Sequence, residues 1–311
     1  MVFFKQNESR WIGMDNSEAA PFFFTKFNCP DTQGVKLAVC GLGYYEFYVN
    51  GRKVGDRELA PIVTEYDRRV RYNVYDISEY LVRGENAVGA ILGPGWYYQL
   101  AVDAWGFEHA QWKHLPKLIA EIRDAAGKLL LGTDRNWMGS VDGPITTSQL
   151  RNGETYDARK EFPAWPTVDF APDSRWRNVG IYASPGGVME EEKATPCRVT
   201  DTFEVTGPRN LFDVYDIGTN ISGRCRITVA GSKPGAKVLL DYAERVTDDG
   251  LLSKYNQDSH VKTGGFQHEE YTLKGDGSDE VWESRFTYHG FQYVSVKIVG
   301  EGVCLKKLEV R

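Results

Sequence analysis

The sequence predicts an all-β protein that folds into two consecutive antiparallel β-sandwich domains of the jelly-roll kind. Short segments in which apolar and polar residues alternate recur along the whole chain, and Gly, Pro, Asn or Asp separates them. Aromatic residues make up 13% of the 311 residues, and 32 glycines are spread without a period, a composition that favours sheets with many turns. No stretch shows sustained helical periodicity. A chain of this length can bury two cores of ordinary size.

Two hairpins are predicted in the first half of the chain. The alternating segment Tyr44–Val49 precedes Asn50-Gly51, a dipeptide that accepts the positive φ angles of a tight turn. Residues 118–123 also alternate and lead through a turn with Gly127 into a short apolar run, although the same segment can be read as a short helix. Further strands are predicted in the second half, over residues 225–229, 237–242, 269–273 and 293–299.

One helical turn and one domain boundary complete the predicted architecture. The turn covers residues 78–81, where Ser78 can cap it and Gly84 can end it. A segment rich in Gly, Pro and charged residues lies between positions 185 and 205, a composition typical of linkers. The predicted domains are therefore residues 1–195 and residues 196–311.

Charge and composition exclude several classes of partner. The net charge of -6 leaves no basic stripe for nucleic acid, and no apolar run is long enough for a membrane span or a signal peptide. We therefore expect the protein to bind neither nucleic acid nor membranes. We also expect it to be cytoplasmic, unless an export signal was removed. The five cysteines form no metal-binding or disulfide pattern, which fits a reducing compartment; they are Cys29, Cys40, Cys197, Cys225 and Cys304.

Several stretches, in the same order and spacing, resemble bacterial α-L-rhamnosidases, glycoside hydrolase family 78. LGYYEFYVNGRKVGDRELAP, TEYDRRVRYNVYDIS and GENAVGAILGPGWY resemble the family's N-terminal domain, and NGETYDAR resembles its end. YDIGTNISGRCRITVAG and FTYHGFQYVSV resemble the β-sandwich that follows it. These stretches occupy residues 42–61, 64–78, 84–97, 152–159, 215–231 and 286–296.

The resemblance implies an accessory role without catalysis. In the family, the second sandwich leads into an (α/α)-barrel whose catalytic carboxylates follow an Asp-Cys-Pro-x-Arg-Asp-Glu-like segment, and no residue of this chain matches it. We therefore expect an accessory part of an α-L-rhamnosidase that supports or binds rhamnose-containing glycans. Its expected partner is the family's catalytic domain or a second copy of the chain. A shortened hydrolase with its own carboxylate pair and a purely structural protein remain the alternatives.

Glu154 and Asp157 in NGETYDAR are the most suggestive carboxylates. Glycoside hydrolysis needs two carboxyl groups that face each other across the scissile bond. A spacing of three residues in an extended segment does not set their separation, and a structural role in turn bonding or in pairing with Arg159 is the better explanation. We assign no catalytic residue and keep both carboxylates as candidates for binding sugar hydroxyls.

An aromatic segment over residues 93–112 is the other candidate sugar site. Rigid aromatic rings bind the apolar faces of sugars at low entropic cost, and the resemblance implies rhamnose binding by the first domain. Trp96 and Tyr97 are the preferred stacking residues because the flanking glycines leave room for a ligand, and Trp105 is a third candidate. Packing of these rings against the rim of a sandwich is the alternative.

No cofactor is predicted. His109 and His114 lack the spacing of a metal site, and His289 is expected to be a hydrogen-bonded turn residue and not a general base. Calcium remains a candidate ligand, because sugar-binding jelly rolls often hold it in oxygen-rich loops. Without a dedicated ligand pattern, solvated turn carboxylates are the better explanation of the aspartates concerned, which are Asp213, Asp216, Asp248 and Asp249.

Overall fold

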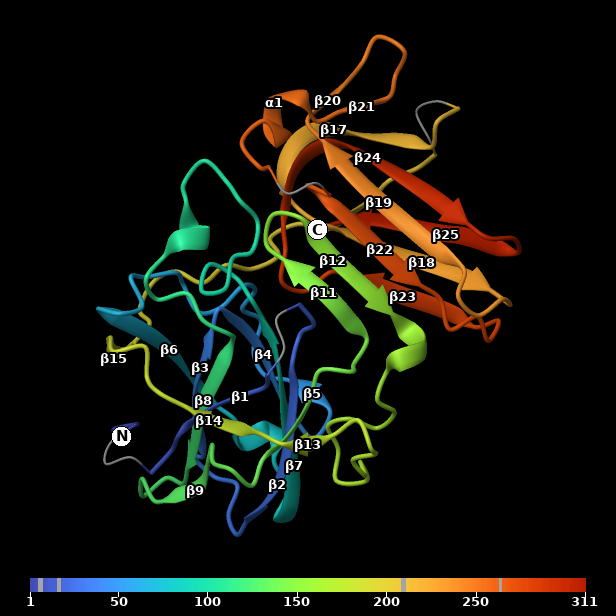
Figure 1. Cartoon of the computed structure of the whole chain (residues 1–311). Helices are drawn as coiled ribbons and strands as arrows, with labels where there is room; N and C mark the ends of the chain where they lie inside the picture. Colours follow the sequence, from blue (N-terminus) through green and yellow to red (C-terminus); the bar gives the residue numbers. More distant parts are fainter. Residues whose placement is uncertain (5–7, 16–17, 208–210, 263–264) are drawn as a thin grey trace. The chain divides into compact units, whose positions relative to one another are not determined.

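The computed structural model describes residues 1–4, 8–15, 18–207, 211–262 and 265–311. The chain is built almost entirely of strands, which confirms the predicted fold class, and it divides into two compact units (Figure 1). None of the helices in the described part of the chain is long and apolar enough to span a membrane. Unit 1 comprises Met1–Tyr98, His109–Gly143 and Phe162–Arg198, and unit 2 comprises Gln99–Glu108, Pro144–Glu161 and Val199–Arg311.

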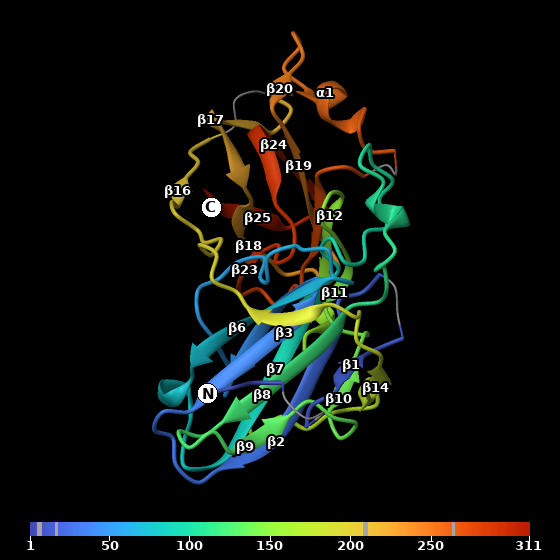
Figure 2. The ribbon, with the colours of Figure 1, turned by 90° about the vertical axis from the view of Figure 1, so that its left-hand side faces the viewer.

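Unit 1 is a sandwich of two sheets. The first has the order β14 (Gly180–Tyr182), β1 (Trp11–Gly13), β8 (Lys117–Arg123), β3 (Lys36–Leu42), β6 (Arg69–Asp76) and β15 (Val188–Glu191), with β9 (Leu129–Gly132) beside β8 (Figure 2). The second has the order β13 (Arg177–Asn178), β10 (Met138–Ser140), β2 (Phe22–Cys29), β7 (Gly84–Gly93), β4 (Tyr44–Val49) and β5 (Arg52–Lys53).

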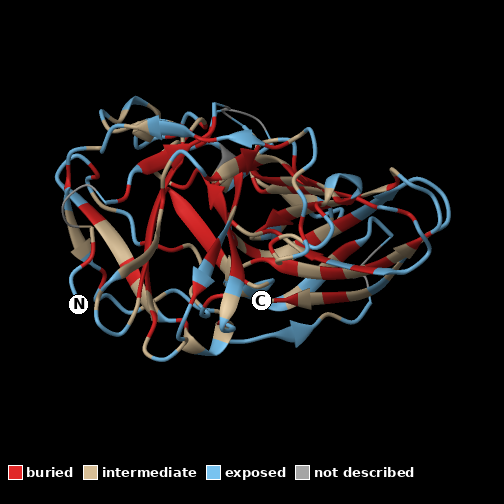
Figure 3. Cartoon of the chain, turned by 90° about the horizontal axis from the view of Figure 1, so that it is seen from below, coloured by how far each residue is buried: buried red, intermediate tan, exposed pale blue. Residues whose placement is uncertain are grey.

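Strand β8 shows why its sequence is ambiguous between strand and helix. Every residue of the strand is buried. Leu118 and Ile122 join the core cluster of the sandwich, whereas Ile119 belongs to a separate cluster with Trp11 and Tyr97. Both faces of β8 are therefore covered. Ile119 lies on the face that otherwise carries the buried charged residues Lys117, Glu121 and Arg123, and it interrupts the alternation of polar and apolar residues. The continuous red colour of such strands is visible in Figure 3.

The predicted hairpins are confirmed, and the helix cap is corrected. Asn50 and Gly51 connect β4 to β5 with φ angles of 48° and 81°, and β8 pairs with β9. The predicted helical turn exists as η1 (Ser78–Tyr80), but the Ser78 side chain makes no capping hydrogen bond. Its backbone N–H instead donates to Asp76 Oδ1 at 3.0 Å. Three short helices were not predicted: η2 (Phe107–His109), η3 (Ala158–Lys160) and α1 (Tyr255–Asp258).

Unit 2 is also a sandwich. It contains all four strands predicted in the second half, as β18 (Cys225–Gly231), β19 (Lys237–Ala243), β22 (His268–Thr272) and β24 (His289–Val299). One sheet has the order β11 (Ile145–Gln149), β12 (Gly153–Asp157), β22 (His268–Thr272), β19 (Lys237–Ala243), β24 (His289–Val299) and β17 (Val214–Gly223). The other has the order β16 (Phe203–Glu204), β25 (Val303–Val310), β18 (Cys225–Gly231) and β23 (Asp279–Glu283), and a ribbon of β20 (Arg245–Val246) and β21 (Leu252–Ser253) stands apart.

Two segments from the first predicted domain, Gln99–Glu108 and Pro144–Glu161, lie in unit 2. Strand β12 pairs in parallel with β22, and Asp103 forms an antiparallel bridge with Val261. The predicted division at residue 195 is a single cut and does not anticipate these two segments. A local pattern identifies a strand but not its partner, and β12 finds its partner more than a hundred residues further along the chain. The pairs β12–β22 and β15–β6 are parallel, unlike the antiparallel pairing predicted.

Candidate functional site

The carboxylates of Glu154 and Asp157 do not form a pair. Both residues lie on β12, which pairs regularly with β22 along Thr155–Asp157. Successive side chains of a strand point to opposite faces, so residues three apart lie on opposite sides. Glu154 is 1% exposed, whereas Asp157 is only partly buried. Their carboxyl groups cannot face each other across a glycosidic bond, and the structure therefore does not support a catalytic pair here.

Each of these carboxylates has a structural partner. Glu154 Oε2 accepts a hydrogen bond from the backbone N–H of Arg285 at 3.3 Å. Asp157 accepts from the backbone N–H of Arg159 at 3.1 Å and from its guanidinium Nε and Nη2 at 2.8 Å each. The Arg159 hydrogen bonds lower the pKa of Asp157. Asp157 therefore stays ionised, caps η3 and pairs with Arg159. This is the structural role expected from the sequence.

Tyr97 is a packing residue of unit 1. Its side chain is 1% exposed, and its ring lies edge-on to Tyr66 with 5.2 Å between the centroids. The Lys117 ammonium lies 5.9 Å from the ring centroid. Burial raises the pKa of the Tyr97 phenol well above its usual value. A ring enclosed in this way offers no face on which a sugar could stack.

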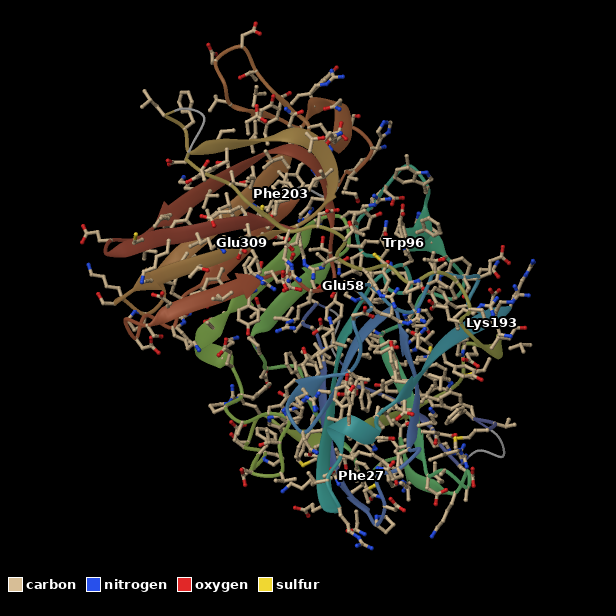
Figure 4. All side chains as sticks on the ribbon, turned by 180° about the vertical axis from the view of Figure 1, so that it is seen from behind. Phe27, Glu58, Trp96, Lys193, Phe203 and Glu309 are labelled. Carbon is tan, nitrogen blue, oxygen red and sulfur yellow. The ribbon has the colours of Figure 1, made fainter. Side chains whose placement is uncertain are left out.

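Trp96 lies half-buried on the loop that follows β7 (Figure 4). Its carbonyl oxygen accepts a hydrogen bond from Trp112 Nε1 at 3.5 Å. The glycine beside it leaves no open space, because a Cβ on Gly95 would lie 3.1 Å from the Tyr44 ring. This corrects the expectation that the glycines make room for a ligand: here they allow close packing of the loop.

Trp105 is the exposed member of the predicted set. Its side chain is 60% exposed, and the Arg151 guanidinium carbon lies 4.9 Å from its ring centroid. Asp103 Oδ1 accepts hydrogen bonds from the backbone N–H groups of Trp105 at 2.9 Å and Gly106 at 3.1 Å. Asp103 Oδ2 accepts from Gln99 Nε2 at 2.5 Å. These bonds hold the turn, and the tryptophan is presented on an ordered support.

The segment before Trp105 is paired with a second segment of unit 2. The Ala104 N–H donates to the His260 carbonyl at 3.0 Å, and the Lys262 N–H donates to the Val102 carbonyl at 2.8 Å. Unit 2 therefore holds Trp105, Glu154 and Asp157, whereas Trp96 and Tyr97 belong to unit 1. Sequence reasoning missed Asp103 and Arg151. Asp103 could have been recognised from the pattern Asp-x-x-Gly, which is typical of turns in which an aspartate side chain accepts hydrogen bonds from backbone N–H groups. No local sequence pattern pointed to Arg151.

A buried polar network lies in the core of unit 2. His289 Nε2 and Glu269 Oε1 are 2.8 Å apart, and the Tyr242 hydroxyl donates to Glu269 Oε2 at 2.6 Å. Tyr242 and His289 also stack, with 4.2 Å between ring centroids. His289 was expected in a turn. It is hydrogen-bonded as expected, but it begins β24 and is 0% exposed. No substrate reaches this network in the folded unit.

Clefts lie on the surface of unit 1 where its residues are described, and the aspartates considered for calcium lie in unit 2. A cleft of 610 Å³ is lined by residues 62–64, Arg71 and residues 190–194, and another of 280 Å³ includes Trp11 and Tyr182. Among the described residues, no group of His, Cys, Asp and Glu side chains is arranged to hold a metal ion. Asp216 Oδ1 instead accepts from the Gly218 N–H at 2.8 Å.

The two units, each built of packed β-sheets, define the class as a two-domain β-sandwich protein. The family model for the α-L-rhamnosidase N-terminal domain matches residues 31–201, and that for the bacterial α-L-rhamnosidase concanavalin-like domain matches residues 210–310. The chain belongs to the bacterial α-L-rhamnosidases of glycoside hydrolase family 78. The resemblance found in the sequence is confirmed.

Individual relatives are much longer than this chain. It is 37% identical to an α-L-rhamnosidase of Streptomyces avermitilis over 84% of this chain and 25% of that protein. It is 33% identical to one of Formosa agariphila over 90% of this chain and 30% of that protein. The solved structure of an α-L-rhamnosidase from Dictyoglumus thermophilum superposes with a TM-score of 0.83 at 31% identity. The match covers 98% of this chain and 36% of the Dictyoglumus thermophilum chain. The solved structure of the Streptomyces avermitilis enzyme in complex with L-rhamnose superposes with a TM-score of 0.82 at 32% identity. The match covers 95% of this chain and 28% of that one.

Proposed function

We propose that this chain is an accessory, non-catalytic part of an α-L-rhamnosidase and that its partner is the catalytic domain of that enzyme. The chain matches 25% and 30% of the length of two curated relatives, so the activity of the whole enzyme need not reside in this part. The arrangement of β12, which separates Glu154 from Asp157, supports the same conclusion. A second copy of the chain is the alternative partner.

We further propose that the chain binds rhamnose-containing glycans through Trp105. The exposed indole on its hydrogen-bonded turn is the observation that carries this proposal. A rigid aromatic ring stacks on the C–H face of a sugar and loses little conformational entropy. We propose rhamnose as the ligand because the structure of the Streptomyces avermitilis relative was solved in complex with L-rhamnose.

Titration with L-rhamnose, followed by tryptophan fluorescence and amide chemical shifts, tests the binding. Free monosaccharides make few contacts, so we expect a dissociation constant on the order of millimolar, about 4 kcal/mol of binding free energy. Trp105→Ala should abolish the response. Tyr288→Ala, which removes an aromatic side chain that is 37% exposed just before β24 in unit 2, is the control and should leave it unchanged.

Two results would contradict the proposed site. Binding that survives Trp105→Ala but is lost in Trp96→Ala would place the sugar on the loop of unit 1. An unchanged spectrum at saturating rhamnose would remove sugar binding from the proposed function.

A further inference from the structure

Strand β15 forms one edge of the first sheet of unit 1. It pairs in parallel with β6, and no other strand pairs with it in the described part of the chain (Figure 1). Its Val188 side chain is 65% exposed. A strand with one unpaired edge presents backbone N–H and C=O groups to which another strand can bond. An extended segment can therefore join the sheet at this edge.

The hydrogen bonding to β6 shows which residues face the free edge. The backbone N–H of Glu192 donates to the Tyr72 carbonyl at 2.8 Å, so this residue faces β6. Backbone groups alternate in direction along a strand. The N–H and C=O groups of Glu191 and Lys193 therefore point away from β6. On this side the Glu191 carbonyl accepts one long hydrogen bond, from Arg71 Nη1 at 3.4 Å.

The side chains of Glu191 and Lys193 carry opposite charges, and both are exposed. They lie two positions apart and point to the same side. Within the described ranges, neither charged group forms a hydrogen bond or an ion pair. Lys193 lies at the margin of unit 1 (Figure 4). Glu192 differs from both, because its side chain is only 4% exposed and lies 2.9 Å from Arg57 Nη1.

Apolar surface lies beside this edge. Residues 62–64 line the cleft of 610 Å³ together with residues 190–194. The Ile62 N–H donates to Glu192 Oε2 at 2.9 Å, which holds the loop next to the strand. The side chains of Ile62 and Val63 are 45% and 41% exposed. Exposed apolar side chains next to unpaired strand backbone are typical of a surface that associates.

Two copies of this edge are complementary when the strands are antiparallel and a two-fold axis passes at Glu192. A two-fold axis makes every contact occur twice. Glu191 of each copy then lies opposite Lys193 of the other, and opposite charges on neighbouring strands attract. Glu192 lies opposite itself, but Arg57 neutralises its charge. An axis at Glu191 would instead place two exposed glutamates opposite each other, which is destabilising.

We propose that the chain binds a second copy of itself through β15, with the two strands antiparallel and Glu191 of each copy paired with Lys193 of the other. The outward backbone groups of these residues form the hydrogen bonds of the new strand pair. This interface is independent of the docking on a catalytic domain and of the glycan binding proposed above. Because the paired stretch is short, we expect a weak interface with a dissociation constant on the order of 100 µM.

Sedimentation equilibrium of the full chain, from about 10 µM to about 1 mM, tests the dimer. The average mass should rise with concentration from that of one chain toward that of two, and salt should weaken the association because exposed ion pairs are screened. Glu191→Lys and Lys193→Glu should each stay monomeric, since each variant places like charges in both symmetry-related pairs. Lys128→Glu, an exposed residue just before β9, makes the same charge change and should still dimerise.

A mixture of the two single variants tests the register of the strands. In a mixed pair, positions 191 and 193 again face opposite charges, so two proteins that are monomeric alone should associate when they are combined. The double variant with both substitutions should dimerise for the same reason. All of these substitutions are at exposed side chains, and unchanged thermal unfolding of each variant would show that the fold is kept.

Three results would overturn the proposed dimer. The first is a chain that remains monomeric at about 1 mM, well above the expected dissociation constant. The second is a dimer that persists in both single variants, because its interface would then lie elsewhere. The third is a mixture of the single variants that does not associate. None of these results affects the accessory role or the glycan binding, which the rhamnose titration tests separately.

Discussion

Glu269 is a carboxylate with no exposed surface, held in the core of unit 2 by Tyr242 and His289. Burial raises its pKa, but the charge and hydrogen bond of His289 and the hydrogen bond of Tyr242 outweigh burial, and the net pKa lies below the usual value of a glutamate. Removal of one partner from a buried, charged hydrogen bond leaves the other partner without compensation. The network therefore contributes to stability only when it is complete.

Glu269→Gln should lower the free energy of unfolding by about 3 kcal/mol at neutral pH. Because the pKa of Glu269 is lower in the folded state than in the unfolded state, where it is about 4.3, its ionised carboxylate stabilises the fold at pH values above 4.3. This stabilisation is lost as the pH falls through the folded-state pKa. The variant should therefore lose stability less steeply in acid than the parent. Denaturant titrations at several pH values measure both effects. Glu301→Gln, at a side chain that is 90% exposed, is the control. If the free energy of unfolding depends on pH in the same way in the parent and in Glu269→Gln, the charge of Glu269 has no role in stability.

The pairing of β12 with β22 depends on the residue that begins β12. Gly153 has φ of +116°, and a Cβ there would lie 1.9 Å from the His268 carbonyl oxygen. Further along the pair, Tyr156 stacks on Tyr271 with 5.7 Å between ring centroids. The strand thus brings an aromatic ring and the buried Glu154 into the core of unit 2, and close approach of the two backbones requires glycine.

Gly153→Ala should destabilise unit 2 by at least about 2 kcal/mol, because it adds a backbone clash to the strain of a positive φ. Gly277→Ala is the matched control. Gly277 also has a positive φ, of +88°, but nothing lies within 4 Å of its added Cβ, so only the strain remains. Thermal or denaturant unfolding of both variants gives the difference. If both variants lose the same free energy of unfolding, the backbone near His268 shifts to accommodate the added Cβ at no cost.

The chain does not complete unit 2 within one continuous stretch. Residues 199–311 contribute β22, but the strands beside its free edge, β11 and β12, come from residues 144–161. Without them, Tyr271 and the backbone of β22 would be open to solvent, and an unpaired apolar edge favours aggregation.

A protein split between residues 198 and 199 should reassemble from its two parts. We expect residues 199–311 alone to give a poorly dispersed amide spectrum and to recover dispersion when co-expressed with residues 1–198. Tyr156→Asp in the first part should prevent recovery, since it buries a charge against Tyr271 and Trp282. Copurification and amide spectra are the measurements. A well-dispersed, monomeric fragment 199–311 would contradict the expectation.

The whole chain should not hydrolyse aryl α-L-rhamnosides. Its carboxylates on β12 lie on opposite faces, and the sequence holds no match to the catalytic segment of the family. Release of the aryl group by purified protein, monitored over hours, measures this. Activity that disappears in Glu154→Gln or Asp157→Asn would restore the alternative of a shortened hydrolase.

The sequence by itself determined the features that depend on neighbouring residues. Alternation identified the strands, Asn50-Gly51 identified a hairpin, and the order of several motifs identified the family. Each of these signals lies within a short stretch of chain, where backbone sterics and side-chain alternation act directly.

Only the tertiary structure decided which aromatic residue is exposed and which strand pairs with which. Tyr97 and Trp105 look alike in sequence, yet contacts with Tyr66 bury the first and a turn held by Asp103 exposes the second. The joining of Glu269 to His289, and of β12 to β22, likewise has no local signal. Burial and pairing arise from contacts between distant segments, and such contacts form only when the whole core is assembled.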